Sequence, residues 1–279
     1  MLNMLHGEFY KLKKSRSFYI SILIAMGLIL LLYATLHMVD NIHEEEQSGN
    51  TRIVVKGEEE VVLDEEGNVV PISQQVGIMG IVQQMFDSHF TEFIIAIFIS
   101  IFVTAEFGNG AIKNVVGKGY SRRTVFLSKL IAAVFVTIIM SLAIIMIIIV
   151  LGIPFLGKKG LEMLVWKDLS IYTGIQMIFG ISFTGIITLV GEFTRSLAAS
   201  ISINLGILMF STSITAGLDL LFHNLNWKAS QYWVLDFQSA CPITNFDQTF
   251  IIRGIIVSVI WFLITTVIGV MHFKKADVK

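Results

Sequence analysis

Histidine, cysteine and carboxylate residues at ligand spacing would indicate a metal-dependent enzyme, and this sequence holds only fragments of such a pattern. His43 and Glu44 begin like the H-E-x-x-H motif of zinc peptidases, but Gln47 stands where the second histidine is needed. The acidic runs lack the D-x-D-x-D-G spacing of a calcium loop. A single cysteine, Cys241, excludes an intrachain disulfide and a multi-cysteine metal site. We therefore expect this chain to hold no metal.

Nucleotide and hydrolase chemistry also lack their motifs. The chain has no G-x-x-x-x-G-K-[ST] phosphate loop and no G-x-S-x-G nucleophile elbow. No paired carboxylates or nucleophile–base pair falls within its apolar runs, which disfavours an intramembrane enzyme. We expect a protein that is not an enzyme and that binds no cofactor itself.

The elements that would position any functional residue are apolar and long. The composition is 54% hydrophobic and 15% charged with a mean hydropathy of +0.76, whereas soluble domains carry about 25% charged residues. A membrane-spanning helix needs roughly 20 mostly apolar residues, and the apolar runs are continuous rather than alternating, as in helices. We predict an all-α polytopic membrane protein, one domain over residues 1–279, with six spans near Ser17–Met38, His89–Phe107, Val125–Ile153, Leu169–Gly191, Leu197–Phe222 and Phe250–Phe273.

Lysine and arginine are distributed unevenly between the two sides of these spans. One side holds thirteen of the 20 and the other holds seven. Because cytoplasmic loops carry the excess of lysine and arginine, both termini are expected in the cytoplasm.

The span interiors are almost free of ionisable residues. Glu92 and Asp219 lie near outer ends, and Glu192 lies at an inner end. Carriers driven by protons or sodium need acidic groups at membrane depth. A transporter of this kind would therefore take its energy from a partner.

A basic, glycine-rich segment, A-E-F-G-N-G-A-I-K-N-V-V-G-K-G-Y-S-R-R-T-V-F-L-S-K-L, separates the second and third spans on the cytoplasmic side. Its glycines permit sharp reversals around residues 111–116, which would form one or two helical turns. The hydroxyls of Ser121 and Thr124 suit a helix N-terminus. Two interpretations remain open: docking of a partner, or anchoring to anionic lipid head groups at roughly 1 kcal/mol per basic residue.

The same segment resembles the loop after the second span in permease subunits of type 2 ATP-binding cassette (ABC) transporters. The likeness is greatest to bacterial permeases of bacitracin- and lantibiotic-type export and self-protection systems, which read E-x-x-x-G-T-[IL]-K-N, then G-x-S-R, then S-K. Ala111 replaces their usual threonine. The N-terminal G-E-F-Y-K-L-K-K-S-R-S-F-Y is similar to the amphipathic entry helix of that family, here residues 1–16.

The resemblance implies a division of labour. Two copies of a separate ATPase subunit would bind ATP and Mg, and a second permease chain, identical or different, would complete a path through the bacterial plasma membrane. A cytoplasmic coupling helix within residues 108–124 would dock on the ATPase, with Glu106 holding the base of the second span through a nearby basic residue. The implied coupling residues are Glu106, Lys113, Asn114, Val116, Tyr120, Ser121, Arg122 and Arg123. The path-lining candidates are Phe98, Phe102, Asn204 and Met209.

Two outer segments complete the predicted layout. Residues 40–88 form an acidic loop that holds either a small β-hairpin or a solvated chain, and residues 223–249 form either an aromatic belt or, by the resemblance, a re-entrant helix pair. The predicted function is ATP-driven export or expulsion of a peptide-like or amphipathic compound, of the antimicrobial-peptide type. The alternative is a membrane receptor or scaffold whose acidic outer loop binds a cationic peptide. No feature indicates binding of nucleic acid.

Overall fold

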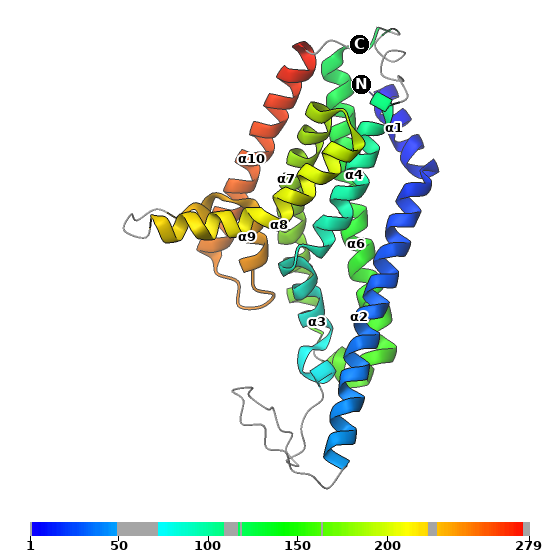
Figure 1. The fold of residues 1–279 in the computed structure, drawn as a ribbon, viewed down its shortest axis with the longest axis vertical. Coiled ribbons are helices and arrows are strands. Elements are labelled where there is room, and N and C mark those ends of the chain that lie inside the picture. The colour runs from blue at the N-terminus through cyan, green and yellow to red at the C-terminus, as the bar shows by residue number, and fades with distance from the viewer. Residues whose placement is uncertain are drawn as a thin grey trace.

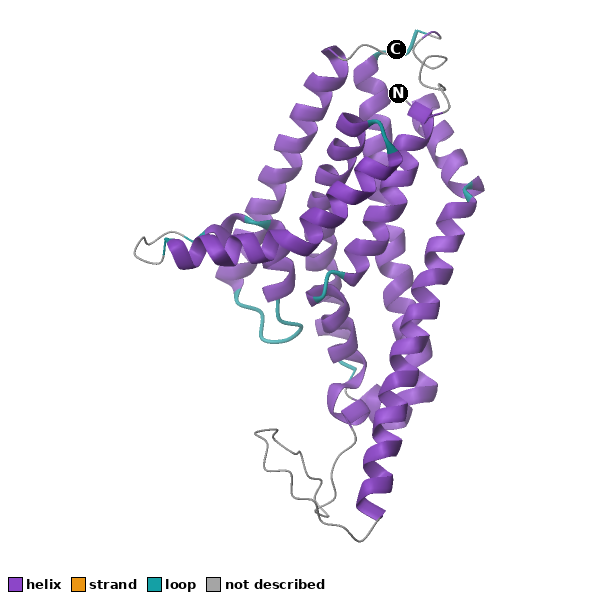
Figure 2. Ribbon diagram, in the orientation of Figure 1, coloured by secondary structure: helices purple, strands orange, loops and turns teal. Residues whose placement is uncertain are grey.

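The computed structural model describes residues 2–48, 72–108, 117, 119–162, 164–222 and 228–275. Over these residues the chain forms helices and connecting loops without a strand (Figure 2). In chain order the elements are α1 (Leu2–Lys14), α2 (Arg16–Ser48), α3 (Ile72–Asp87), α4 (Phe90–Gly108), α6 (Arg122–Glu162), α7 (Trp166–Thr194), α8 (Leu197–Leu221), the 3-10 turn η1 (Ala229–Tyr232), α9 (Val234–Ala240) and α10 (Gln248–Lys275).

Six of these helices are long and apolar enough to cross a membrane: α2, α4, α6, α7, α8 and α10. They coincide with the six predicted spans, so the prediction of an all-helical, multi-pass membrane protein is confirmed. The second span has only a short uncharged part, but it is a helix: α4 covers the predicted span from Phe90 onward.

The predicted outer segment over residues 40–88 is partly helical, and its place outside the membrane stays a prediction. Helix α2 continues through the acidic run to Ser48, and α3 occupies residues 72–87. Glutamate is a good helix former, so H-E-E-E extends α2 rather than ending it. The predicted hairpin strands, within residues 52–71, lie outside the described residues.

The third span also extends beyond its predicted end. Helix α6 runs through Pro154 to Glu162, although the sequence prediction ended at Ile153. Proline is tolerated inside membrane helices, where neighbouring groups and local adjustments satisfy the freed carbonyl.

Helix α7 lies at the centre of the bundle. In its apolar part 67% of the residues are buried, against 17% in α8 and 22% in α2, which therefore lie at the periphery. Helix α7 packs against α10, α6, α4 and α8. The α7–α10 contact is close: an added Cβ on Gly254 would lie 2.9 Å from the ring of Phe179.

Helix α1 and the C-terminal end of α10 lie at the same end of the bundle (Figure 1). Met4 of α1 and Phe273 of α10 share a small apolar cluster with Val125, Phe126 and Leu130 of α6. We call this the α1 end. At the opposite end, α2, α3 and the second half of α6 pack against one another, and Gly152 of α6 approaches both Tyr33 and Ile78.

Candidate functional site

A network of charged side chains ties three helices together at the α1 end. Lys129 of α6 has no exposed surface, and its Nζ lies 2.9 Å from Glu106 Oε2 of α4. The same ammonium group donates a hydrogen bond to the Val103 carbonyl at 3.2 Å and lies 5.0 Å from the centre of the Phe107 ring. A buried charge is tolerated only when paired and hydrogen-bonded, so this pair fixes α4 against α6.

Lys11 extends the network to α1. Its Nζ lies 2.9 Å from Glu8 Oε1 and also contacts Glu106 Oε1. Burial, reinforced by the charge of Glu106, raises the pKa of Glu8 above its usual range. Burial lowers the pKa of Lys11, but its hydrogen bonds to Glu106 and Glu8 outweigh that effect and the net shift is upward. The ion network, Glu8, Lys11, Glu106 and Lys129, therefore joins α1, α4 and α6.

Of the sequence-predicted coupling residues, those that begin α6 lie next to this network. The Ser121 hydroxyl accepts a hydrogen bond from the Thr124 amide at 3.2 Å, which confirms the predicted cap. Gly119 has φ of 83°, a conformation that glycine adopts without strain. Tyr120 packs on the apolar cluster of the α1 end, Arg122 is half-buried and Arg123 is exposed. Lys113, Asn114 and Val116 lie outside the described residues.

The path-lining candidates do not face one common space within this chain. Phe98 is buried, stacked on Phe102 and edge-on to Phe18. Asn204 is fully buried between α8 and α4, where its amide donates to Ser100 Oγ at 2.9 Å. Met209 is 66% exposed on α8. Phe98 and Asn204 therefore join helices, and the assignment of all four to a path stays a prediction.

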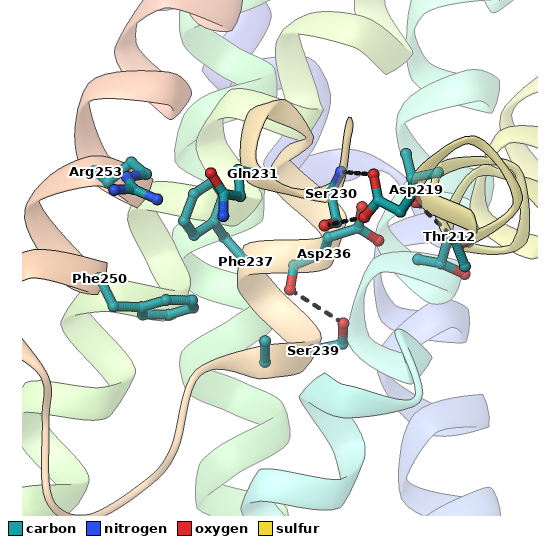
Figure 3. Close-up of a pocket in the computed structure, with 12 residues that line it drawn as sticks. Thr212, Asp219, Ser230, Gln231, Asp236, Phe237, Ser239, Phe250 and Arg253 are labelled. Carbon is teal, nitrogen blue, oxygen red and sulfur yellow. Dashed lines mark hydrogen bonds between the residues drawn. The ribbon is translucent and has the colours of Figure 1, made fainter. Parts of the chain in front are cut away.

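A pocket of about 470 Å³ opens between α8, η1, α9 and α10, away from the α1 end. Asp219 on one wall accepts hydrogen bonds from the amides of Ala229 and Ser230 and from the Ser230 hydroxyl, so it fixes η1 to α8. Phe250 and Arg253 of α10 form the other wall (Figure 3). Between residues 228 and 247 this segment comprises one 3-10 turn and one seven-residue helix, and its assignment as a re-entrant pair stays a prediction.

Asp236 lies between the two walls of the pocket. Burial raises the pKa of Asp236 to about 6, a hydrogen bond with Thr215 opposes that effect, and the charge of Asp219 adds to it. The pocket therefore joins acidic groups, one arginine and two phenylalanine rings, a lining suited to an amphipathic molecule.

The described residues contain no group of three or more histidine, cysteine, aspartate or glutamate side chains that could hold a metal ion. The full amino-acid sequence contains no phosphate-loop motif.

Sequence reasoning missed the partners of Glu106. The charge count placed Lys11 and Lys129 on the cytoplasmic side without partners. In the structure Lys11 bridges two carboxylates, and Lys129 is completely buried. Lys129 lies in the second turn of α6, only seven residues after Arg122. A charge inside an apolar helix, 23 residues after an acidic residue at the end of the preceding span, was the available signal.

Comparison with protein families gives one match for this chain. The family described as "Protein of unknown function (DUF2705)" matches residues 60–279, which include five of the six spans. No curated protein matches the chain.

Proposed function

We propose that this chain, which belongs to the DUF2705 family of proteins of unknown function, is the permease subunit of an ABC transporter. It would carry no ATPase site, and two copies of a separate ATPase subunit would supply the energy. A second permease chain would complete the path for a peptide-like or amphipathic compound. The resemblance of residues 105–130 to the coupling loop of such permeases supports this proposal.

The observation that carries the proposal is the position of the ion network beside that loop. The connection over residues 109–121 leaves α4 just after Glu106 and enters α6 seven residues before Lys129. Because Glu106 and Lys129 pair directly, a force on the connection would act on both helices together rather than separate them. Lys11 would pass the same displacement to α1. This is the mechanical arrangement that a docked ATPase requires.

The orientation follows from the charge count, with the α1 end in the cytoplasm of a bacterial cell. The pocket between α8 and α10 then lies at the N-terminal end of α10, which is the end away from the cytoplasm. Its acidic and aromatic lining supports a cationic, amphipathic compound as the transported molecule. Alternating access would move that compound when closure of the ATPase pushes the loop and tilts α4 and α6.

The experiment that tests the proposal is affinity purification of the tagged chain from its host in mild detergent. We expect a co-purifying ATPase of roughly 25–35 kDa, an ordinary size for one domain or two small ones, and ATP hydrolysis that depends on both subunits. Purification of the chain alone, without nucleotide-dependent activity, would contradict the permease assignment. That outcome would favour the receptor, whose cationic peptide ligand would then bind to membranes that contain this chain alone.

A further inference from the structure

Glu92 is a buried carboxylic acid with one of its two oxygens unsatisfied. It lies in the first turn of α4, within a membrane span, and only 2% of its surface is exposed. Its Oε1 accepts a hydrogen bond from Gln238 Nε2 of α9, 146 residues away. Its Oε2 is buried without a hydrogen-bond partner. One half of the carboxyl group therefore has a donor and the other half has none.

Gln238 presents the matching vacancy. Its side chain is fully buried, and its Oε1 also lacks a partner. The residue is held in place from a third helix, because Gln176 Nε2 of α7 donates to the Gln238 carbonyl at 3.1 Å. In this contact the Gln238 amide group donates one hydrogen bond to Glu92. One acceptor oxygen on each side chain, Glu92 Oε2 and Gln238 Oε1, is left without a hydrogen-bond donor.

Among the described residues, no cation acts on a negative charge at this position. Apart from burial, only the Gln238 amide and the backbone amide of Glu92 itself act on the carboxyl group. The ion network lies about 21 Å further along α4, at 1.5 Å for each of the 14 residues to Glu106. A lone carboxylate buried away from water carries a large desolvation penalty and either pairs or takes up a proton.

The titratable groups on the surrounding elements do not change this balance. Helix α4 packs against α2, α3, α6, α7 and α8. Burial lowers the pKa of His89, the nearest histidine along the chain, and so favours its neutral form. On α6, Thr137 lies beside Gly180 of α7. Its side chain does not titrate, and its hydroxyl is hydrogen-bonded to the hydroxyl of Thr184. The described cationic residues of these helices are Arg16, Arg122, Arg123, Lys129 and Lys167, and none of them is among the groups that act on the Glu92 carboxyl group. The other described titratable side chains on these helices and on α9 are Tyr19, Tyr33, His37, Asp87, Asp168, Tyr172, Glu192, Asp219 and Asp236, and the Cys241 thiol directly follows α9.

We propose that Glu92 is a proton-binding site. One proton, taken from water, binds Oε2 and is donated to Gln238 Oε1, while Gln238 Nε2 continues to donate to Glu92 Oε1. The two side chains then form a cyclic acid–amide pair in which both unsatisfied oxygens are used. This neutral pair fastens α9, and with it one wall of the outer pocket, to α4. Release of the proton to water breaks one of the two hydrogen bonds and leaves two acceptors facing each other, which loosens α9.

This inference goes beyond the permease assignment and does not depend on an ATPase partner. Its test uses the single cysteine of the chain, Cys241, which is fully buried and directly follows α9. Labelling of Cys241 by a maleimide therefore reports loosening of α9. The matched variant is Glu92→Gln, whose amide can form the same cyclic pair with Gln238 but cannot lose a proton. Both proteins would be labelled as full chains in lipid nanodiscs over a range of pH.

The ratio of the two labelling rates removes the pH dependence of the thiol itself. We expect the labelling rate of the wild type divided by that of Glu92→Gln to be near one in acid. This ratio should rise with pH by up to about tenfold per pH unit, which is the limit for release of one proton. Equal rates at every pH, including no labelling of either protein, would overturn the proposal.

A second measurement keeps the test independent of labelling. The infrared spectrum of the wild type minus that of Glu92→Gln should contain the C=O band of a protonated carboxylic acid in acid, and this band should disappear as the labelling ratio rises. A carboxylate band at every pH would also overturn the proposal. Loss of ATPase co-purification would leave both results unaffected, so failure of the permease assignment and failure of the proton site are distinguishable.

Discussion

Lys129 and Glu106 form an ion pair of 2.9 Å in which the lysine is completely enclosed by the protein. The pair joins the last turn of α4 to the second turn of α6 and lies on either side of the connection that we assign to the ATPase. Because the two partners lie on different helices, removing the pair would measure how much it contributes to holding α4 against α6.

Replacing Lys129 by methionine should lower the free energy of unfolding by about 3 kcal/mol, since Glu106 loses its buried partner and keeps only the partly exposed Lys11 as a counter-charge. Thermal unfolding of the purified chain in detergent measures this. The double variant Lys129→Met with Glu106→Gln should recover a large part of the loss, because no lone charge remains. Lys13→Met, which removes an exposed lysine of α1, is the control and should change stability little. A double variant as unstable as the single one would argue against the pair.

Reversing the two arginines at the start of α6, in Arg122→Glu with Arg123→Glu, should reduce co-purification of the ATPase by at least about tenfold, or 1.4 kcal/mol. Opposite charges at a docking surface become like charges, which suppresses association. The matched control reverses two basic residues of α1, Lys13→Glu with Lys14→Glu, and should retain the ATPase. Equal membrane insertion of both variants is measured by fractionation. If the two variants lose the ATPase equally, these arginines act only through the net charge of this end.

Close packing of α10 predicts the effect of one methyl group. In Gly254→Ala the new Cβ would lie 2.9 Å from Phe179 Cζ and 3.0 Å from Phe237 Cδ1. Overpacking of this kind costs about 1–3 kcal/mol, and a lowered unfolding temperature would measure it. Gly217→Ala on α8 is the control, because no atom lies within 4 Å of its added Cβ. Equal unfolding temperatures for the two variants would mean that α10 can move away from α7 without cost.

The raised pKa of Asp236 predicts a pH dependence of stability. Burial raises this pKa to about 6 from an ordinary value of 3.8. Between these values the folded state binds more protons than the unfolded state, so the contribution of Asp236 to stability falls as the pH rises from 4 to 6.

Asp236→Asn should remove the part of the pH dependence of stability that comes from Asp236. The variant should unfold at a higher temperature than the wild type at pH 7. At pH 3, where Asp236 is largely protonated in both states, the two proteins should unfold at similar temperatures, which makes the acid measurement the internal control. A variant whose advantage is equally large at both pH values would exclude titration as the cause.

The six spans could be predicted because continuous apolar runs of this length have few other structures available to them in a membrane. Their ends could not, because residues 40–48 and 72–87 mix charged, polar and apolar side chains that suit a helix or a loop equally. The Ser121 cap was predictable, since hydroxyl capping is local to a few residues. Helix α6 continues past the predicted end at Ile153 through Pro154, because the helix-breaking effect of proline is weaker inside a membrane protein than in water.

The contacts of the candidate sites were less accessible than the helices. Glu106 could be assigned a basic partner in general terms, but several lysines and arginines lie within reach in the sequence, and only the depth of Lys129 in α6 distinguishes it. The Glu92–Gln238 contact joins residues 146 positions apart. No local pattern connects them, because their proximity follows from how α9 packs on α7, α10 and α3 within the bundle.

The helices opposite the α1 end are longer than a membrane requires. At 1.5 Å per residue, the 41 residues of α6 extend about 60 Å, twice the roughly 30 Å of the hydrocarbon core. Helices α2 and α6 pack against each other and against α3, so in a membrane their surplus lengths would form a stalk that projects beyond the lipid. A stalk that continues two membrane helices without interruption acts as a lever. A small tilt of α2 or α6 within the bilayer would become a larger sideways sweep at its tip, and a molecule that grips the tip would restrain that tilt from outside.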